Sequence, residues 1–357
     1  MMRQACSAWC MTLVLFGCQQ TAPQPLFQSV GGEALGTTWA VQWKTADAVE
    51  EETVRAGIVQ TLARLDLAMS TWRPDSEISR VRAGGKVPVS PETAMVILAG
   101  LDLAHHTHGA FDPTVQPLME LWGLHGNPRT SEPTAGEIAA AHSQVGWSRV
   151  RVEKNEGQWF VDAGGTALDL GGMAKGTGVD WIAANFEDWG ITSFLIEVGG
   201  EMRLSGEGPR GTWRVGIDHP TQRNAGRPLA FVWSGSDRAV ATSGNYRNQY
   251  QLEGRTIAHT MDPRTATPVS TGVLSATVVA PDCQTADGVA TALMVMGYEE
   301  GRKFVESDSR LEAAWVLSSS PELILRYTPE MRAGMGMVAP GIGDHETIGV
   351  PDGNALR

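Results

Sequence analysis

The sequence predicts an α+β fold, with mixed, mostly antiparallel sheets against which helices pack. Segments with the 3.6-residue apolar spacing of helices alternate with short strand-like runs along the 357 residues. Strand segments outnumber helical ones in the second half, and short loops join many of them. This pattern favours antiparallel pairing over a doubly wound parallel sheet. The apolar fraction of 42% is ordinary for a globular protein and excludes disorder and fibrous structure.

The first three helices are indicated by their N-terminal signals. Asp47-x-x-Glu50 has the spacing of a capping box, and the apolar stripe Val54–Met69 behind it has helical spacing. Ser90-Pro91 predicts a helix over about 91–108, because serine suits the N-cap and proline suits the first helical position. Thr134-x-x-Glu137 begins a short third helix.

The second half is expected to be richer in strands. A fourth helix covers about Ala174–Trp189, and a fifth, apolar-rich helix covers Thr285–Met296. The runs that predict strands are Phe194–Val198, Trp213–Ile217, Leu229–Trp233, Ala239–Thr242, Thr256–Thr260 and Val273–Ala280. We place one folded domain over 27–333. Residues 334–357 contain several glycines, two prolines and no periodicity, so we expect a loosely held tail there.

The N-terminus has the features of a secreted lipoprotein. Arg3 is the only charged residue in 1–17, and the apolar stretch after it is too short to span a bilayer. Leu15-Phe16-Gly17-Cys18 is similar to the bacterial lipobox, whose cysteine becomes the lipidated first residue. We therefore expect a signal peptide over 1–17, a lipid anchor on Cys18, a tether over 18–26, and a cell-envelope protein that faces the periplasm. The alternative is ordinary signal cleavage near Ala22.

Charge and cysteine content restrict the function further. The formal net charge of −12 argues against a nucleic-acid binder, because a phosphate backbone would be repelled over most of the surface. Cys6 and Cys10 leave with the signal and Cys18 takes the lipid, so Cys283 remains alone. No disulfide is expected, even in an oxidising compartment.

A glycine-rich segment over 162–176 is the first chemical candidate. Five glycines and Lys175 lie just before and within the first turn of the expected fourth helix, where backbone N–H groups suit a phosphate. No Gly-Lys-Ser/Thr follows the required spacing, so this is not a Walker loop, and a tight strand–helix turn explains the segment equally well. Gly206-x-Gly208-x-x-Gly211 matches a dinucleotide fingerprint in letters only, because a strand follows it; we interpret it as a hairpin.

Asp287 and Thr291 form the second candidate. They stand at i and i+4 of the expected fifth helix, so their oxygens point the same way. A carboxylate and a hydroxyl suit part of the shell of Mg²⁺, a hard cation that also takes substrate phosphates as ligands. The alternative is a capped first turn in which the threonine bonds back to the backbone.

Single aromatic and imidazole side chains carry weaker signals. His259, in an expected strand, has a side chain that can accept a proton near neutral pH. Trp72 can stack on an aromatic ring, although a lone tryptophan more often lies in a core. His105, His106 and His108 fall at the end of the second helix, where the helix dipole favours them, so we expect a structural role there.

Together and in this order, these segments resemble the ApbE family of FAD:protein FMN transferases. The matching strings are Leu35-Gly-Thr-Thr-Trp39, Met69-Ser-Thr-Trp-Arg-Pro-Asp-Ser-Glu-Ile-Ser79, Gly109-Ala-Phe-Asp-Pro-Thr-Val115, Asp169-Leu-Gly-Gly-Met-Ala-Lys-Gly176, Glu197-Val-Gly-Gly-Glu201, Ala241-Thr-Ser-Gly-Asn-Tyr-Arg247, His259-Thr-Met-Asp-Pro-Arg-Thr265 and Ala286-Asp-Gly-Val-Ala-Thr291. They cover about residues 30–328. The resemblance implies a T-fold-like architecture, with FAD in a cleft between subdomains.

The resemblance also implies a set of site residues. The positions that contact FAD are Leu35, Trp72, Ala110, Phe111, Asp112, Asp169, Lys175 and Met261. The Mg²⁺ site comprises the backbone carbonyl of Gly172 with Asp287 and Thr291, and Ala290 lies close to the ion. His259 takes the position proposed to activate the acceptor hydroxyl. Lys175 and Asp287 join His259 in the catalytic set.

The reaction implied by the resemblance is a transfer of FMN. A Ser or Thr hydroxyl of a partner flavoprotein, such as a subunit of a redox complex, attacks the FMN-side phosphorus of FAD, and AMP leaves. Mg²⁺ offsets the charge of the pyrophosphate. Two rival classes stay open: a metal-dependent FAD pyrophosphatase that releases FMN and AMP, and a lipoprotein that binds FAD without catalysis.

Overall fold

The protein is described from a computed structural model, which covers residues 27–45, 49–82, 85–220, 229–245, 249–319, 323–339 and 342–344. The signal peptide, Cys18 and tether expected in 1–26 lie outside the described residues, as do residues 345–357. Within the described ranges, no helix is both long enough and apolar enough to cross a membrane.

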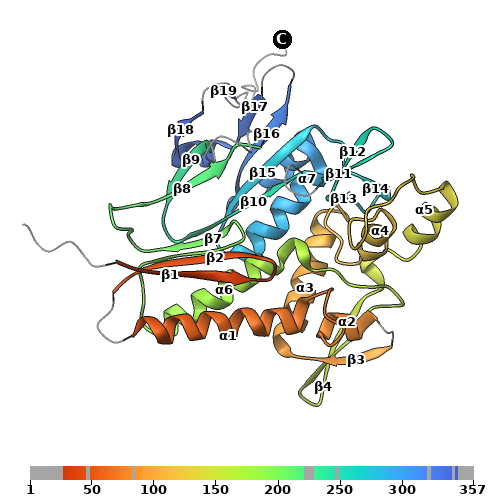
Figure 1. Cartoon of the computed structure of the whole chain (residues 1–357), viewed down its shortest axis with the longest axis horizontal. Coiled ribbons are helices and arrows are strands. Elements are labelled where there is room, and N and C mark those ends of the chain that lie inside the picture. The colour runs from red at the N-terminus through yellow and green to blue at the C-terminus, as the bar shows by residue number, and fades with distance from the viewer. Residues whose placement is uncertain are drawn as a thin grey trace, which may run out of the picture.

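A nine-stranded sheet forms the centre of the molecule (Figure 1). Its strands, in spatial order, are β1 (Phe27–Ala34), β2 (Thr37–Lys44), β6 (Phe194–Val198), β7 (Glu201–Ser205), β10 (Arg238–Gly244), β15 (Val273–Ala280), β16 (Glu312–Ser318), β17 (Leu323–Tyr327) and β19 (Ile342–Asp344). Neighbouring strands run antiparallel, except for β17 and β19, which run parallel. The predicted α+β class is therefore confirmed.

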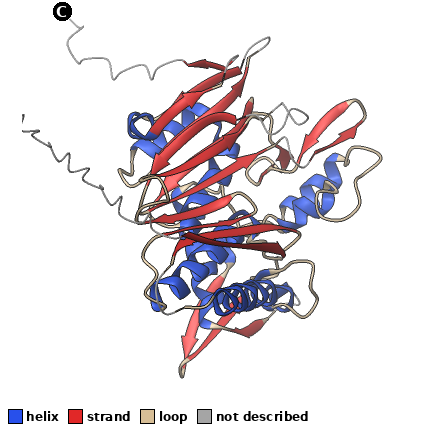
Figure 2. Ribbon diagram, turned by 60° about the vertical axis from the view of Figure 1, so that its left-hand side comes forward, coloured by secondary structure: helices blue, strands red, loops and turns tan. Residues whose placement is uncertain are grey.

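Different layers cover the two faces of this sheet. The helices of one layer, partly visible behind and below the strands in Figure 2, are α1 (Glu51–Met69), α3 (Pro91–His106), α6 (Gly171–Asp188) and α7 (Cys283–Glu306). The opposite face carries a small sheet of β8 (Trp213–Asp218), β9 (Leu229–Gly235) and β18 (Met335–Val338). Alternate residues of the central strands separate the two cores: Ala239 and Ala241 of β10 pack with the helices, whereas Val240 packs with the small sheet.

The remaining elements form the edge of the molecule. They are α2 (Glu77–Arg82), β3 (Lys86–Val89), α4 (Gln116–Leu121), α5 (Ala135–His142), a 3₁₀ turn (Trp147–Arg149), β4 (Arg151–Asn155), β5 (Gln158–Asp162), the hairpin β11 (Gln249–Leu252) with β12 (Arg255–Ala258), the hairpin β13 (Met261–Asp262) with β14 (Thr267–Pro268), and α8 (Pro329–Gly334). A third, small core forms between α4, α5 and the two hairpins, and its buried members include Leu118, Trp122 and Met261.

Helix starts follow their local caps. Ser90 caps α3, with Pro91 at its start, and Thr134 forms the predicted capping box of α5, which confirms both predictions. The predicted box before α1 is wrong: the helix begins at Glu51 without a side-chain cap, and Asp47 lies outside the described residues. The predicted start of α6 near Ala174 is also wrong, because the helix already begins at Gly171.

The predictions for two glycine-rich segments differ in outcome: one is confirmed and the other is wrong. Gly208 and Gly211 bridge each other in an antiparallel turn before β8, which confirms the hairpin interpretation. The expectation of a loose tail is wrong for the described residues after 333, because Met335 in β18 and Ile342 in β19 bury their side chains against the small-sheet core. Single apolar residues between glycines show no periodicity, so the sequence alone did not reveal these strands.

Candidate active site

A cavity of about 650 Å³ opens where the core between the central sheet and its helices meets the third core. A second cavity of about 720 Å³ adjoins it and shares Leu35, Trp72, Asp169 and Lys175 with it. The first cavity is lined by His259 and by every residue at an expected FAD or metal position except Ala290. These residues are Leu35, Trp72, Ala110, Phe111, Asp112, Asp169, Gly172, Lys175, His259, Met261, Asp287 and Thr291. Ala290 is fully buried, and its methyl group offers no donor atom.

Three oxygen donors of different kinds meet between α6 and α7. The hydroxyl of Thr291 donates to the carbonyl oxygen of Gly172 at 3.3 Å and lies 3.3 Å from the hydroxyl of Ser243. The buried carboxylate of Asp287, one turn earlier on α7, accepts the N–H of Gly176 at 3.0 Å. Burial raises the pKa of Asp287, against the lowering effect of Lys175. A carbonyl, a hydroxyl and a carboxylate are the hard donors that Mg²⁺ accepts, so these residues fit a divalent cation.

Two glycines of α6, one before and one after Lys175, allow this approach of two helices. A Cβ on Gly172 would lie 3.1 Å from the hydroxyl oxygen of Thr291 and 3.1 Å from the ring of Phe111. A Cβ on Gly176 would lie 2.2 Å from the carbonyl oxygen of Cys283, at the start of α7. Because α6 begins at Gly171, Lys175 stands beyond the first turn, and these two glycines serve helix packing rather than a phosphate loop.

Lys175 lies between two carboxylates. Its Nζ is 3.5 Å from Oε1 of Glu201 and 3.7 Å from Oδ1 of Asp287. Burial lowers the pKa of Lys175, but the charges of Asp287 and Glu201 outweigh that effect, so the pKa of the ammonium group lies above its ordinary value. Glu201 belongs to the matching string 197–201, but no role for it follows from the sequence, since no spacing rule connects it to Lys175.

The cavity is strongly acidic. Its described lining carries the four carboxylates of Asp112, Asp169, Glu201 and Asp287, with Lys175 as the one lysine or arginine among them. A dianionic pyrophosphate would be repelled by such a lining unless a cation joined it. The charge of the lining therefore favours a phosphate ligand that is accompanied by a cation.

Asp112 stabilises its own turn. Its Oδ1 accepts the backbone N–H of Thr114 at 2.8 Å and the hydroxyl of Thr114 at 2.6 Å, and its Oδ2 accepts the N–H of Trp147 at 3.4 Å. Burial raises the pKa of Asp112, and these bonds counteract the rise. The carboxylate thus holds the segment from Ala110 onward against the cavity wall.

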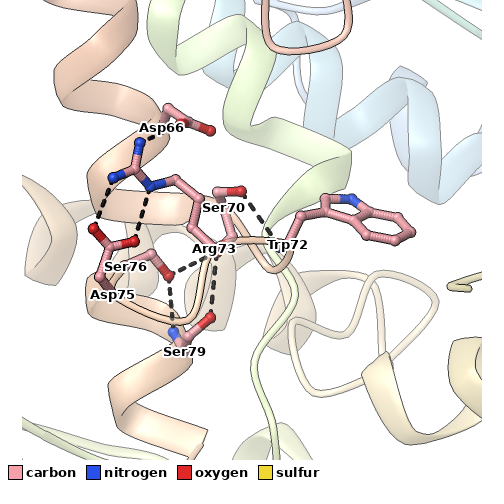
Figure 3. Close-up of polar contacts among 7 residues, drawn as sticks. All are labelled: Asp66, Ser70, Trp72, Arg73, Asp75, Ser76 and Ser79. Carbon is pink, nitrogen blue, oxygen red and sulfur yellow. Dashed lines mark hydrogen bonds and ion pairs between the residues drawn. The ribbon is translucent and has the colours of Figure 1, made fainter.

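An arginine clamp holds the loop after α1 (Figure 3). The guanidinium of Arg73 donates to both oxygens of Asp75, at 3.0 and 2.7 Å, and to Asp66 on α1 at 3.0 Å. The hydroxyl of Ser76 donates to the carbonyl oxygen of Ser70 at 2.6 Å. These polar residues of the string 69–79 fix the path of the loop, a role that the sequence alone did not reveal.

Trp72 lies in this loop, directly before Arg73, and lines the cavity. Its side chain points away from the Arg73 clamp (Figure 3) and is 71% exposed, so it is not a core residue. Its ring lies 4.0 Å from that of His125, at an angle of 39°. Opposite, Leu35 and Gly36 form the two-residue turn of the β1–β2 hairpin, both with positive φ, 54° and 71°.

Replacing Trp72 by alanine should weaken FAD binding by up to about tenfold, because an aromatic stacking pair contributes about 0.5–1.5 kcal/mol. The thermal unfolding midpoint should stay unchanged, since the side chain is exposed. Flavin fluorescence titration measures the first quantity and calorimetry the second. Trp72→Tyr, which keeps a ring, serves as the control, and equal FAD affinity in all three proteins would contradict a stacking role.

His259 lines the cavity from the bend that follows β12, not from within a strand as predicted. The hairpin strand ends at Ala258, because the chain turns there to begin β13 at Met261. The bend is held by the hydroxyl of Thr260, which donates to the side-chain oxygen of Asn245 at 2.7 Å. His259 is thus carried by a loop between two short hairpins, and faces the same cavity as Asp287 and Lys175.

The fold matches solved flavin transferases. The structure of flavin transferase ApbE from Vibrio cholerae aligns with a TM-score of 0.77 and 30% identity, covering 87% of this chain and 99% of that chain. The apo form of Pseudomonas stutzeri flavinyl transferase ApbE aligns with a TM-score of 0.79 and 28% identity, covering 88% and 99%. Fold and site together therefore define an enzyme of the transferase class.

Sequence comparison identifies the family. Residues 35–315 match the model of the ApbE family. A relative from Vibrio cholerae serotype O1, named FAD:protein FMN transferase, is 34% identical over 313 residues, which are 86% of this chain and 92% of the relative. A relative of the same name from Klebsiella pneumoniae is 33% identical and covers 82% and 86%. The chain belongs to the ApbE family, as the matching strings indicated.

Proposed function

We propose that this enzyme transfers FMN from FAD to a Ser or Thr hydroxyl of a target flavoprotein, with Mg²⁺ as cofactor and AMP as leaving group. The observation that carries the proposal is the acidic cavity, in which carboxylate, hydroxyl and carbonyl oxygens converge beside a single lysine. Gly172, Asp287 and Thr291 would hold the cation. When bound, Mg²⁺ supplies the positive charge that lets a pyrophosphate enter this lining and accept a nucleophile.

The chain's own residues would divide the remaining work. The acceptor oxygen forms a bond to the FMN-side phosphorus, and the phosphorus–oxygen bond to the AMP moiety breaks. A neutral His259 takes the hydroxyl proton, and AMP leaves with the bridging oxygen. Lys175 binds a phosphate oxygen as a fixed positive charge. Trp72 and Leu35 contact the ligand at the rim of the cavity.

One experiment separates this reaction from its two rivals. The purified chain is incubated with FAD, Mg²⁺ and a candidate acceptor flavoprotein carrying a Ser or Thr motif, and the acceptor is then weighed by mass spectrometry. A gain of one FMN supports transfer. Free FMN with AMP supports a pyrophosphatase, and intact FAD supports binding without catalysis.

His259→Ala should lower the turnover number by about 10²–10⁴-fold, the usual contribution of a general base. FAD affinity should stay within about twofold of the wild-type value, since the proposed role of His259 concerns the acceptor proton. Single-turnover transfer assays and flavin fluorescence measure the two quantities. His125→Ala, which alters the other imidazole of the lining, is a comparison variant. An unchanged rate in His259→Ala would remove His259 from the mechanism.

We also propose that Cys18 carries a lipid that anchors the enzyme at the envelope, facing the periplasm. The lipobox-like string Leu15-Phe16-Gly17-Cys18 supports this proposal. Cys18→Ser should release the protein from the membrane fraction into the soluble fraction. Mass spectrometry of the N-terminal peptide checks the modification, and an unmodified peptide starting near Ala22 would favour ordinary cleavage.

A further inference from the structure

We propose that Glu201 is a positioning residue that keeps the ammonium group of Lys175 aimed into the cavity while Asp287 holds a divalent cation. The inference rests on the proposed function, because it concerns the cation and the pyrophosphate of that reaction. It gives a role to a carboxylate that lies beside the expected FAD and metal positions without belonging to either set.

Glu201 is placed as a buried acceptor beside Lys175. It is the first residue of β7, and only 3% of its surface is exposed. Its Oε1 lies 3.5 Å from Nζ of Lys175, whereas its buried Oε2 has no hydrogen-bond partner among the described residues. A buried carboxylate oxygen without a partner is costly, so an ordered cation close to it stabilises the arrangement. Glu201 thus has capacity to bind the ammonium group more fully.

Asp287 cannot bind the ammonium group of Lys175 and a divalent metal ion equally well. Its Oδ2 accepts the N–H of Gly176 at 3.0 Å, so Oδ1, which faces Lys175 at 3.7 Å, is the oxygen left for a metal ion. A divalent cation there would repel the ammonium group. Burial raises the pKa of Glu201 to about 8, and the charge of Lys175 acts against that rise, so the ammonium group at 3.5 Å favours the ionised carboxylate. Glu201 then offers Lys175 a partner that the metal ion does not occupy.

The β6–β7 hairpin fixes Glu201 relative to the lysine. Its turn packs on the lysine stem: a Cβ on Gly199, whose φ is +65°, would lie 3.2 Å from Cδ of Lys175. The N–H of Gly200 donates to Oε1 of Glu197 at 2.6 Å, which braces the turn from its other strand. The hairpin therefore carries two carboxylates, of which Glu201 faces the ammonium group and Glu197 holds the turn.

Ligand affinity, measured by flavin fluorescence, tests the proposal on the full chain. Lys175 is proposed to bind a phosphate oxygen, so its position should matter for FAD, which carries a pyrophosphate, and not for riboflavin, which carries no phosphate. In the presence of Mg²⁺, the dissociation constant of FAD should therefore rise about tenfold in E201Q, while that of riboflavin stays unchanged. E201D, which keeps the carboxylate, should fall between E201Q and the wild type.

The control is E197Q, which removes the other carboxylate of the same hairpin and should bind FAD and riboflavin with wild-type affinity. A wild-type FAD affinity in E201Q, an equal loss of riboflavin affinity in E201Q, or an equal rise of the FAD dissociation constant in E197Q would overturn the proposal. If E201Q does not fold, E201D against E197Q decides it by the same criterion.

These affinity measurements need neither an acceptor protein nor turnover. A chain that fails to transfer FMN would therefore refute the proposed function and leave the affinity result intact. Conversely, active FMN transfer with unchanged FAD affinity in E201Q would refute the role of Glu201 alone.

Discussion

Asp287→Ala should abolish Mg²⁺-dependent transfer of FMN, with a loss in kcat/KM of at least about 10³-fold. The carboxylate is 2% exposed and lies one helical turn from Thr291, so no neighbouring side chain on α7 replaces it. Its loss leaves the pyrophosphate facing an acidic lining with no charged ligand for the cation. The mass of the acceptor, followed across an Mg²⁺ titration, measures the effect, and calorimetry measures Mg²⁺ binding directly.

The matched control is Asp282→Asn on the same helix. Asp282 caps α7 by accepting the N–H of Thr285 at 2.8 Å and does not line the cavity. Asparagine caps a helix about as well as aspartate, so stability and activity should both stay close to wild type. Full activity of Asp287→Ala, or of the wild type in the presence of a chelator, would count against the metal assignment.

Gly176→Ala should destabilise the protein by about 3 kcal/mol or more, among the larger effects seen for single substitutions. The added Cβ would lie 2.2 Å from the carbonyl oxygen and 2.6 Å from the carbonyl carbon of Cys283, and 2.9 Å from Cβ of Asp287. Two of these three atoms belong to backbone, so relief requires α6 and α7 to separate. Separation would also move Asp287 away from Gly172, so metal affinity should fall together with stability.

Gly136→Ala is the comparison for this substitution. Gly136 lies near the start of α5, and a Cβ there would meet no atom within 4 Å. Alanine is the better helix former by up to about 1 kcal/mol, so this variant should be neutral or slightly stabilised. Denaturant unfolding of both variants measures the difference. Equal stability of Gly176→Ala and Gly136→Ala would show that the helices can adjust, and the close-packing argument would be wrong.

Local patterns predicted much of the fold. The capping box at Thr134 and the Ser90-Pro91 start work through residues three or fewer positions apart, so no knowledge of distant contacts was needed. Strands such as Val273–Ala280 were predicted because β-branched and small apolar side chains suit a sheet covered on both faces. The orientation of Asp287 and Thr291 also followed from helix geometry alone.

Other features depend on contacts that no spacing rule reveals. Lys175 was predicted in the first turn of a helix, with a phosphate site and a plain strand–helix turn left as alternatives. The structure places it beyond the first turn of α6, between two carboxylates from other elements. The string 69–79 was one of the strings that resemble the family, with Trp72 as its expected flavin contact. Its arginine and serines hold the loop that presents Trp72. Side-chain chemistry identified the residues, but their roles depend on the neighbours that the fold supplies.

The class of fold, most element positions and the donor types of the site follow from the amino-acid sequence, because each is set by periodicity, caps and side-chain chemistry within a few residues. That Gly176 and Asp287, 111 residues apart, touch, and that Glu201 faces Lys175, is visible only in the folded chain. The charge of the cavity and the packing of α6 on α7 arise from surfaces that burial brings together. Such contacts are absent from any local stretch of the chain.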